Sequence, residues 1–348
     1  MSRCMDTFSW PSVLGPLTRG EDISRAMASA ALGEIMAGNA TPSQIAAYLA
    51  ALATKGESAD EMAGMVDAMM DAAVTVDIDA TVVDIVGTGG DGFGTFNIST
   101  TAAFIAAGAG VKVAKHGNRA ASSNTGSADL LEALGFDLEL GPEAVTTMIE
   151  ETGFGFFFAP RFHPAMRHVA PVRRELGVRT VFNYLGPLCN PAGARMSIGA
   201  SDPDMARLMV EALAARGVDR AFVVHGEDGL DELTTTGPSR IYRLVDGEIT
   251  EAEFTPEDFG VQRASISDLV GGDAKENVAI TRAVLAGASG PHRDIALVNA
   301  APAIVLAELA SGFTEAMGLA SEAVDSGAAE DVLRTSLARN RSLTESSS

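Results

Sequence analysis

Residues 82–100 constrain the fold of this chain more than any other stretch. The run 82–86 is apolar and rich in β-branched residues, and it is too short for a helix, so it is typical of a buried strand. Five glycines then follow within residues 87–94. A loop with so few Cβ atoms can turn several backbone N–H groups toward one point, and Ser99 is placed to cap a helix behind it. This pattern predicts a binding site for a phosphate or a diphosphate.

A second polar loop follows the next strand candidate, residues 111–114. The strand leads into the segment 115–119, Lys-His-Gly-Asn-Arg, and then into 126–129, Gly-Ser-Ala-Asp, which opens a helix. If the two strands are parallel neighbours, both loops leave the same edge of the sheet. In open α/β sheets that edge is where ligands bind. The sequence therefore predicts one site built from both loops.

The acidic balance of the chain limits its partners. Its net charge of -21 would repel nucleic acid and anionic membranes, so any phosphate site must be locally basic. Cys4 and Cys189 lie far apart and form no CxxC pair, which is typical of a reducing compartment. The sequence has no signal-peptide pattern and no unbroken apolar stretch that could span a bilayer. We expect a soluble cytoplasmic protein that binds neither nucleic acid nor membranes.

Residues 21–74 predict a small helical lobe of three amphipathic helices. Thr41-Pro42 places a cap before a proline at the first helical position, and Ser58 with Glu61 forms a capping-box pattern. The preceding residues, 1–17, are expected to form a loose lead-in. The short helices carry many Met and Ala residues that need a partner surface, and a dimer interface is one use for them.

From Val82 onward strand and helix patterns alternate, which indicates a mostly parallel sheet covered by helices. Further strand candidates are residues 154–158, 195–200, 221–225 and 241–245. The polar connection 160–194 is too long for an ordinary loop and is expected to form short helices that reach the helical lobe as a hinge. We therefore predict an α/β fold with a helical domain at 1–80, joined by a helical insertion at 165–192, an α/β domain at 81–340, and a disordered tail at 341–348.

The glycine loop has other interpretations. It satisfies GxGxxG, but a dinucleotide fold requires a helix at once and an acidic residue at the end of the next strand, where this chain has Lys115 and His116. A Walker A loop is excluded because GK[ST] is absent. A plain tight turn does not need five glycines together with Asp91 and Ser99.

The charged residues outside the glycine loop also have two interpretations each. Lys115 and Arg119 could be solvated loop charges, yet a polyanion in the glycine loop would need cations nearby. Asp231 and Glu232 could be plain surface charge, or they could bind Mg²⁺, which takes one or two protein carboxylates plus phosphate oxygens. Residues 161–179 hold five arginines and one glutamate, a local charge of +4, which predicts a funnel for an anionic substrate unless the arginines only cover apolar surface.

Seven motifs occur in one order along the chain: Gly87-Thr88-Gly89-Gly90-Asp91, Asn97-Ile98-Ser99-Thr100, Lys115-His116-Gly117-Asn118-Arg119, Gly126-Ser127-Ala128-Asp129, His163-Pro164-Ala165-Met166, the segment 179–188, and Gly229-Leu230-Asp231-Glu232. Together they resemble the anthranilate phosphoribosyltransferase family over about residues 12–340. The resemblance implies a fold like that of nucleoside phosphorylases and phosphoribosyltransferases. It also implies transfer of phosphoribosyl from phosphoribosyl diphosphate (PRPP) to anthranilate, with Mg²⁺, by a homodimer joined through its helical lobes.

The resemblance also implies roles for individual residues. Ser99, Asp231 and Glu232 would be the metal positions, and Lys115, Asn118 and Arg173 the catalytic ones. The anthranilate side would include Asn118, His163, Arg173 and Gly186, with Arg173 as the partner of the carboxylate. Substrate-binding positions would also include Gly87, Gly89, Gly90, Asp91, Thr95, Asn97, Ser99, Thr100, Lys115, His116, Gly117, Arg119, Ser122, Ser123 and Ser127.

Three rival functions stay open from the residues alone. A pyrimidine-nucleoside phosphorylase shares the architecture and breaks the same type of bond. A non-catalytic relative would bind a ligand without turnover, although the acids at Asp231 and Glu232 argue against it. A nicotinamide enzyme is the third.

Overall fold

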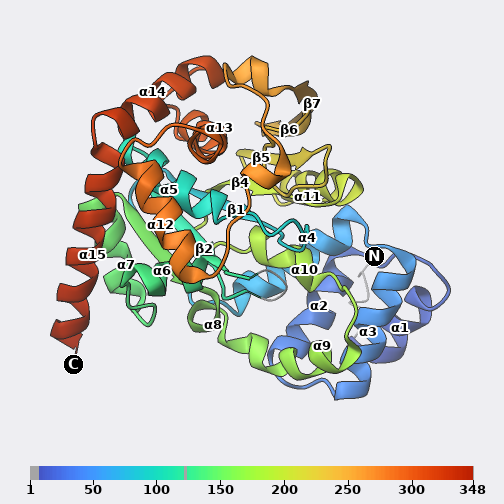
Figure 1. Ribbon diagram of the computed structural model, residues 1–348. Coiled ribbons are helices and arrows are strands. Elements are labelled where there is room, and N and C mark those ends of the chain that lie inside the picture. Colours follow the sequence, from blue (N-terminus) through green and yellow to red (C-terminus); the bar gives the residue numbers. More distant parts are fainter. Residues whose placement is uncertain (1–7, 121–123, 348) are drawn as a thin grey trace.

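The computed structural model describes residues 8–120 and 124–347. The N-terminal lobe is built from four helices (Figure 1): α1 (Trp10–Leu17), α2 (Arg25–Met36), α3 (Pro42–Lys55) and α4 (Ala59–Asp71). The predicted Thr41 cap of α3 and the predicted capping box of Ser58 with Glu61 at α4 are confirmed, and Thr41 also forms a capping box with Gln44, which the sequence analysis did not predict. Each box satisfies backbone N–H groups that the first helical turn leaves without partners.

The expected loose lead-in is wrong for residues 10–17, which form α1. The Ser9 side chain caps this helix, a proline occupies its first turn, and Val13 and Leu17 are buried. The methionines of α4 do not form the exposed surface that suggested a dimer. Met62 and Met65 are fully buried within the chain itself.

The larger lobe is organised around a seven-stranded sheet in the order β3-β2-β1-β4-β5-β6-β7. Strands β1 to β5 pair in parallel, and β6 and β7 are antiparallel additions at one edge. The strands are β1 (Val82–Gly87), β2 (Lys112–Gly117), β3 (Phe154–Phe158), β4 (Arg195–Gly199), β5 (Arg220–Gly226), β6 (Ser239–Val245) and β7 (Glu248–Phe254). The prediction of a mostly parallel sheet is confirmed.

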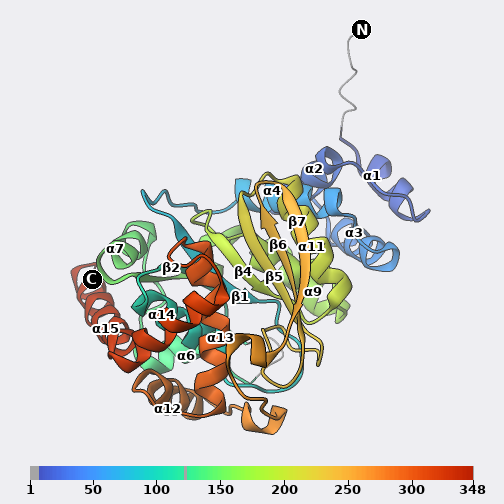
Figure 2. The ribbon, with the colours of Figure 1, turned by 90° about the horizontal axis from the view of Figure 1, so that it is seen from above.

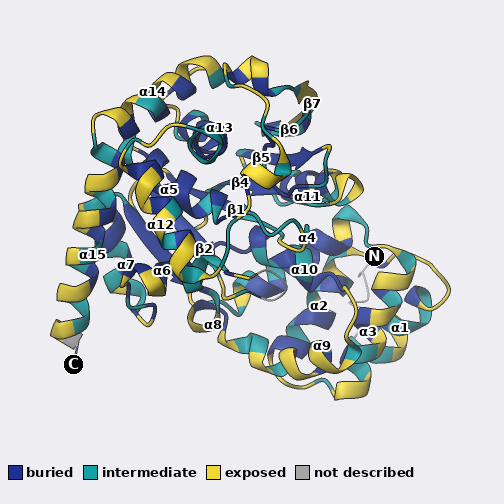
Figure 3. Ribbon diagram, viewed as in Figure 1, coloured by how far each residue is buried: buried dark blue, intermediate teal, exposed yellow. Residues whose placement is uncertain are grey.

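Helices cover both faces of this sheet. Figure 2 shows α13 (Pro291–Leu306) and α14 (Phe313–Asp325) on one side of strands β4 to β7 and α11 (Pro203–Ala215) on the other. Strand β5 alternates accordingly: Phe222 and Val224 face one core, and Ala221 and Val223 face the other. The other helices are α5 (Ile98–Gly108), α6 (Ser127–Leu134), α7 (Pro142–Thr152), α12 (Ala274–Leu285) and α15 (Ala328–Ser347). In Figure 3 the central strands, α5 and α13 are largely buried, whereas the edge strand β7 and the outer sides of α14 and α15 are exposed.

Short helices fill the long connection, as the sequence predicted. They are α8 (Ala159–Phe162), the 3-10 helix Pro164–His168, α9 (Ala170–Leu176), α10 (Phe182–Leu185) and the 3-10 helix Gly186–Leu188. Val172 and Leu185 pack in the same core as Leu49 of α3, so this segment joins the helical lobe. Two further 3-10 turns, Pro256–Phe259 and Ile266–Asp268, follow β7. The boundaries of the two domains stay predictions.

The prediction of a disordered tail at 341–348 is wrong for residues 341–347, which continue helix α15. The Thr344 hydroxyl donates to the Asp137 carboxylate at 3.0 Å, and the Asn340 side chain bonds the Asp137 backbone, so α15 is tied to the segment after α6. Ser348 lies outside the described residues.

Candidate functional site

The glycine loop leaves the carboxyl end of β1, at the point where the strand order reverses. The chain runs from β1 outward through β2 to β3 and then returns to place β4 on the other side of β1. The Thr88 N–H donates to the Gly199 carbonyl at 2.9 Å, so the loop lies against the end of β4. Such a reversal opens a crevice at the carboxyl ends of the strands, where α/β proteins bind ligands.

The acidic loop after β5 reaches the same point. Asp231 Oδ2 accepts the Gly89 N–H at 2.6 Å. A Cβ at Gly87 would collide with the Asp231 carboxylate, and a Cβ at Gly199 would collide with the Asp231 carbonyl. Glycine at these two strand ends therefore permits the close approach of the acidic loop.

Acidic side chains are concentrated here in a place where their ionisation is unfavourable. Burial, followed by the charge of Asp91, raises the pKa of Asp231, and burial, followed by the charge of Asp231, raises the pKa of Glu232 well above its ordinary value. Lys115 lies beside these acids, and its Nζ donates to the Ile85 carbonyl at 2.5 Å and to Ser99 Oγ at 3.3 Å. Burial lowers the pKa of Lys115 below its ordinary value, and the charges of Asp84 and Glu232 only partly oppose that shift.

Lys115 links the predicted metal positions, because its Nζ donates to Ser99 Oγ at 3.3 Å and its charge, like that of the neighbouring Asp231, acts on Glu232. Within residues 8–120 and 124–347, no three His, Cys, Asp or Glu side chains converge to enclose a metal by themselves. An incomplete oxygen-donor set whose carboxyl groups are hard to ionise without a cation fits Mg²⁺, which keeps water and substrate phosphate among its ligands. It does not fit a structural zinc cage.

Helix α5 begins differently from the sequence prediction. Its N-cap is Asn97, which makes no side-chain cap bond, and Ser99 lies inside the first turn, so the Ser99 cap is wrong. The Asn97 side chain instead donates to the Thr125 carbonyl at 2.9 Å, and Thr95 forms an isolated bridge to Val270. The Thr100 hydroxyl is buried without a partner in this turn. Because α5 begins at Ile98, only a few residues after the glycine loop, the positive end of its dipole lies directly behind that loop.

At the end of β2, His116 and His163 form a neutral pair of rings with centroids 5.0 Å apart. Burial, and then the charge of His163, lowers the pKa of His116 to about 3, opposed by a hydrogen bond with the Gly186 backbone. Burial also lowers the pKa of His163, whose Nε2 bonds the Cys189 carbonyl at 2.9 Å. His116 Nε2 is buried without a partner.

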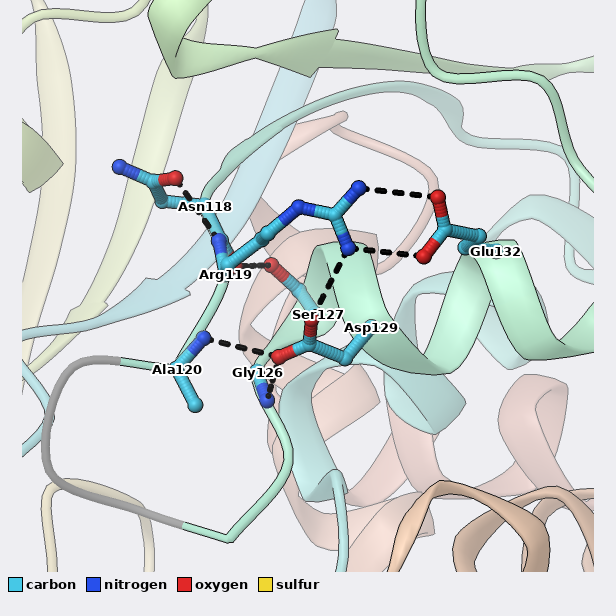
Figure 4. A network of polar contacts seen from close by, with 7 residues as sticks. All are labelled: Asn118, Arg119, Ala120, Gly126, Ser127, Asp129 and Glu132. Atoms are coloured by element: carbon cyan, nitrogen blue, oxygen red, sulfur yellow. Dashed lines mark hydrogen bonds and ion pairs between the residues drawn. The ribbon is translucent and has the colours of Figure 1, made fainter.

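Arg119 is already paired with acidic residues (Figure 4). Its guanidinium contacts Glu132 at 2.7 Å and Asp129 at 3.2 Å on α6, and Asp129 also accepts the N–H groups of Ala120 and Gly126. The loop is closed further by Ser127 Oγ, which donates to the Asn118 carbonyl at 3.4 Å. Gly117 gives the space for Ser127, because a Cβ there would collide with that hydroxyl. The predicted positions Ser122 and Ser123 lie outside the described residues.

The arginine-rich connection carries Arg173 on α9 and Arg179 between α9 and α10. The Arg173 guanidinium lies 5.3 Å from the centroid of the Phe182 ring, and burial lowers its pKa. Arg179 Nη2 donates to the Gly90 carbonyl at 2.9 Å. Neither guanidinium has a carboxylate partner among residues 8–120 and 124–347. Arg161, in contrast, lies 4.0 Å from Glu139 at the far side of the segment.

Comparison with known proteins decides the family. Residues 11–73 match the model of a glycosyl transferase family helical bundle domain, and residues 79–330 match that family's a/b domain. Anthranilate phosphoribosyltransferase from Moorella thermoacetica is 52% identical over 327 residues, which is 93% of this chain and 96% of that protein. The chain belongs to the anthranilate phosphoribosyltransferase family.

Solved structures of the anthranilate phosphoribosyltransferase family have the same fold. The crystal structure of the Thermus thermophilus enzyme is 47% identical and superposes with a TM-score of 0.90, covering 94% of this chain and 99% of that one. The Saccharomyces cerevisiae enzyme, solved in complex with PRPP and Mg, is 29% identical with a TM-score of 0.88, covering 96% and 98%.

Two buried polar residues next to this site, Asp84 and Asn190, were not singled out in the sequence analysis. Asp84 of β1 accepts the His116 N–H at 3.1 Å and Asn190 Nδ2 at 2.8 Å. Asn190 also donates to the Ala114 carbonyl at 2.7 Å. A charged residue within an apolar run was the only signal for Asp84, and nothing in the sequence pairs it with Asn190. Together they fix the end of β2 against the connection.

Proposed function

We propose that this chain transfers the 5-phosphoribosyl group of PRPP to the amine of anthranilate and releases pyrophosphate, a step of tryptophan biosynthesis. The observation that carries the proposal is the bond from the Gly89 N–H to Asp231, which brings the glycine loop and the acidic loop to one point. Family membership supports the same reaction. A pyrimidine-nucleoside phosphorylase is not favoured, because the relatives described above are all anthranilate phosphoribosyltransferases.

Mg²⁺ fits the donor set of Ser99, Asp231 and Glu232. When bound with PRPP, it would neutralise charge on the departing diphosphate. The two carboxylates already repel each other in a buried place, so a cation relieves an unfavourable charge that the fold has set up. The Saccharomyces cerevisiae relative, solved with PRPP and Mg, supports Mg²⁺ as the metal.

The diphosphate belongs against the glycine loop and the first turn of α5. The backbone N–H groups of the loop and the unpartnered Thr100 hydroxyl are donors at the positive end of this helix. Lys115 supplies a cation within reach of Ser99. We include Asn97, Ser99 and the 118–127 loop in this site. Arg119 has a smaller part there, because Asp129 and Glu132 already compensate its charge.

The chemistry needs help mainly at the leaving group. Breaking the bond at C1 of ribose through a loose, oxocarbenium-like state puts negative charge on pyrophosphate before the new bond forms. Preorganised amide dipoles and Lys115 stabilise that charge without reorganising at the moment of reaction. The amine of anthranilate is neutral at pH 7 with a free lone pair, so a strong base is not required at the start.

The anthranilate side is formed by Arg173, His163, Gly186 and Asn118. Arg173 is a half-buried guanidinium without a carboxylate partner among the described residues, which suits the substrate carboxylate. The two histidine rings are neutral, so they offer the aromatic ring a surface and do not compete for its carboxylate.

A fluorescence assay tests the function. With PRPP and Mg²⁺ present, anthranilate fluorescence should fall as pyrophosphate is released in equal amount. A protein that leaves anthranilate unchanged would contradict the proposal. Release of a pyrimidine base from its nucleoside, dependent on inorganic phosphate, would identify the phosphorylase instead.

Assembly and location are further parts of the proposal. We propose a homodimer joined through the helical lobes and a cytoplasmic location. No helix within residues 8–347, apart from the undescribed 121–123, is long and apolar enough to cross a membrane. Light scattering coupled to size-exclusion chromatography measures the assembly, and a monomer at micromolar concentration would contradict it.

A further inference from the structure

The loop that carries Asp231 and Glu232 is held by a residue far away in sequence. Asn299 lies within α13 and is 4% exposed. Its Oδ1 accepts the Leu233 N–H at 2.9 Å, and its Nδ2 donates to the Leu233 carbonyl at 2.9 Å. Both backbone groups of the residue next to Glu232 are therefore satisfied by one side-chain amide. A third bond, from Nδ2 to the Ile295 carbonyl at 2.9 Å, fixes that amide on its own helix.

The other end of the loop is fixed by Asp228. Its Oδ2 accepts the hydroxyls of Thr234 at 2.7 Å and Thr236 at 2.5 Å, and its Oδ1 accepts the Leu230 N–H at 3.1 Å. These bonds shape the turn but tie it only to itself. Asn299 is different, because it ties the loop to helix α13 and lies 66 residues beyond Leu233 in the chain.

Helix α13 packs on α5, whose first turn carries Ser99. The acidic loop and Ser99 come from distant parts of the chain, and a rigid shared support is what keeps such groups in register. Without the Asn299 amide, the Leu233 backbone groups would be buried and unpaired, and the loop would move to find partners.

We propose that Asn299 is a positioning residue that holds Asp231 and Glu232 in the geometry that binds Mg²⁺. The proposal rests on the proposed function for the identity of the metal. The clamp itself does not depend on the metal, so it can be tested in the metal-free protein.

Asn340 of α15 serves as a matched control, which distinguishes positioning of the carboxylates by Asn299 from a purely structural role. Its side chain makes the same reciprocal pair of bonds, accepting the Asp137 N–H at 2.8 Å and donating to the Asp137 carbonyl at 3.0 Å, and it is also 4% exposed. Asp137 lies after α6, outside the acidic loop. Asn299→Ala and Asn340→Ala therefore remove the same reciprocal pair of bonds to a backbone, and only the pair made by Asn299 leads to the carboxylates.

The experiment compares these two variants with the parent protein. Asn299→Ala should raise the Mg²⁺ concentration for half-maximal turnover about tenfold, since loss of a group that orients metal ligands weakens metal affinity to this degree. Calorimetric titration of Mg²⁺ with PRPP should show the same loss, while the KM for anthranilate stays unchanged. Hydrogen exchange of residues 227–238 in the metal-free protein should become faster. Asn340→Ala should lower the melting temperature comparably and leave Mg²⁺ dependence and loop exchange unchanged.

Equal effects of both variants on Mg²⁺ dependence, or unchanged loop exchange in Asn299→Ala, would overturn the proposal. If Asn299→Ala does not fold, Asn299→Ser takes its place, because its short hydroxyl keeps a neutral polar group but cannot reproduce the paired bonds to the Leu233 N–H and carbonyl. Asn340→Ser is then the control. A parent protein without turnover would refute the proposed function, and loop exchange would still decide whether Asn299 orders the acidic loop.

Discussion

Arg179 and Gly90 join the two lobes through one hydrogen bond, from the guanidinium Nη2 to the glycine carbonyl at 2.9 Å. Arg179 lies in the connection between α9 and α10, which packs with the helical lobe, and Gly90 lies in the glycine loop of the α/β lobe. The contact brings a guanidinium with no carboxylate partner in the described part of the chain to the edge of the proposed diphosphate site. It therefore makes the helical lobe part of that site.

Removing this guanidinium should weaken PRPP binding. Arg179→Ala loses both the positive charge and the anchor of the glycine loop, and a hydrogen bond to a charged group typically corresponds to about a tenfold change in affinity. The KM for PRPP should rise by that factor, and the KM for anthranilate should change little. Steady-state kinetics with each substrate varied in turn measures both values. A larger effect on anthranilate would show that Arg179 serves the other substrate.

Substitutions at Gly90 and Gly92 separate backbone strain from the Arg179 contact. Both glycines have positive φ, 80° and 79°, so alanine is strained at either position by a similar amount. A Cβ at Gly90 would collide with Arg179, whereas a Cβ at Gly92 meets nothing within 4 Å. Gly90→Ala should therefore raise the KM for PRPP more than Gly92→Ala does.

A double variant completes the test of this collision. In the Arg179→Ala background the guanidinium is absent, so Gly90→Ala should have only the effect of Gly92→Ala. Additive effects of Gly90→Ala and Arg179→Ala would mean that the two residues act independently. Far-ultraviolet circular dichroism of each variant confirms that the fold is retained.

Local sequence patterns predicted the parts of this fold whose causes are local. The capping residues at Thr41 and Ser58 satisfy backbone groups three residues away, so a short window contains all the information. The buried parallel strands were visible as apolar runs for the same reason. Strand β7 was missed because Glu248–Phe254 is an exposed edge strand with three glutamates, and its partner β6 determines its conformation more than its own composition does.

The site was predictable as a set of motifs and not as a set of contacts. The glycine loop and the acids after β5 were both recognised, but their meeting at Gly89 and Asp231 depends on the strand order. Arg119 has a side chain suited to a phosphate, yet in the folded chain its guanidinium pairs with two carboxylates of α6. Asp84 and Asn190 are 106 residues apart, and only the folded chain pairs them.

Arg173 should determine the affinity for anthranilate. Arg173→Ala leaves the substrate carboxylate without its cation, so the KM for anthranilate should rise at least about tenfold, as for a lost charge-assisted bond. The KM for PRPP should change much less. Arg174→Ala is the matched control, because it removes the same charge from the same helix at an exposed position. Similar kinetics for the two variants would mean that Arg173 acts only through the general charge of the segment.

The buried His116 ring should make the protein less stable in acid. The pKa of His116 is lowered to about 3 in the folded protein, mainly by burial, whereas the unfolded chain binds a proton near pH 6.5. The unfolded state therefore holds more protons between these values, and stability falls as the pH falls through this window. From pH 7 to pH 5 the contribution of His116 amounts to about 2 kcal/mol, at about 1.4 kcal/mol for each pH unit well below 6.5.

His116→Asn removes this titration. When the pH is lowered from 7 to 5, the free energy of unfolding should therefore fall by about 2 kcal/mol less in His116→Asn than in the parent. Urea denaturation at each pH measures the difference. Asp84 affects stability in the opposite direction. Burial raises its pKa to about 6, so its contribution to the free energy of unfolding is present at low pH and is lost as the pH rises through that value. Asp84 accepts the backbone N–H of residue 116, which the variant keeps, so the Asp84 contribution cancels in the comparison. Equal slopes for the two proteins would mean that the His116 ring gains a proton without unfolding.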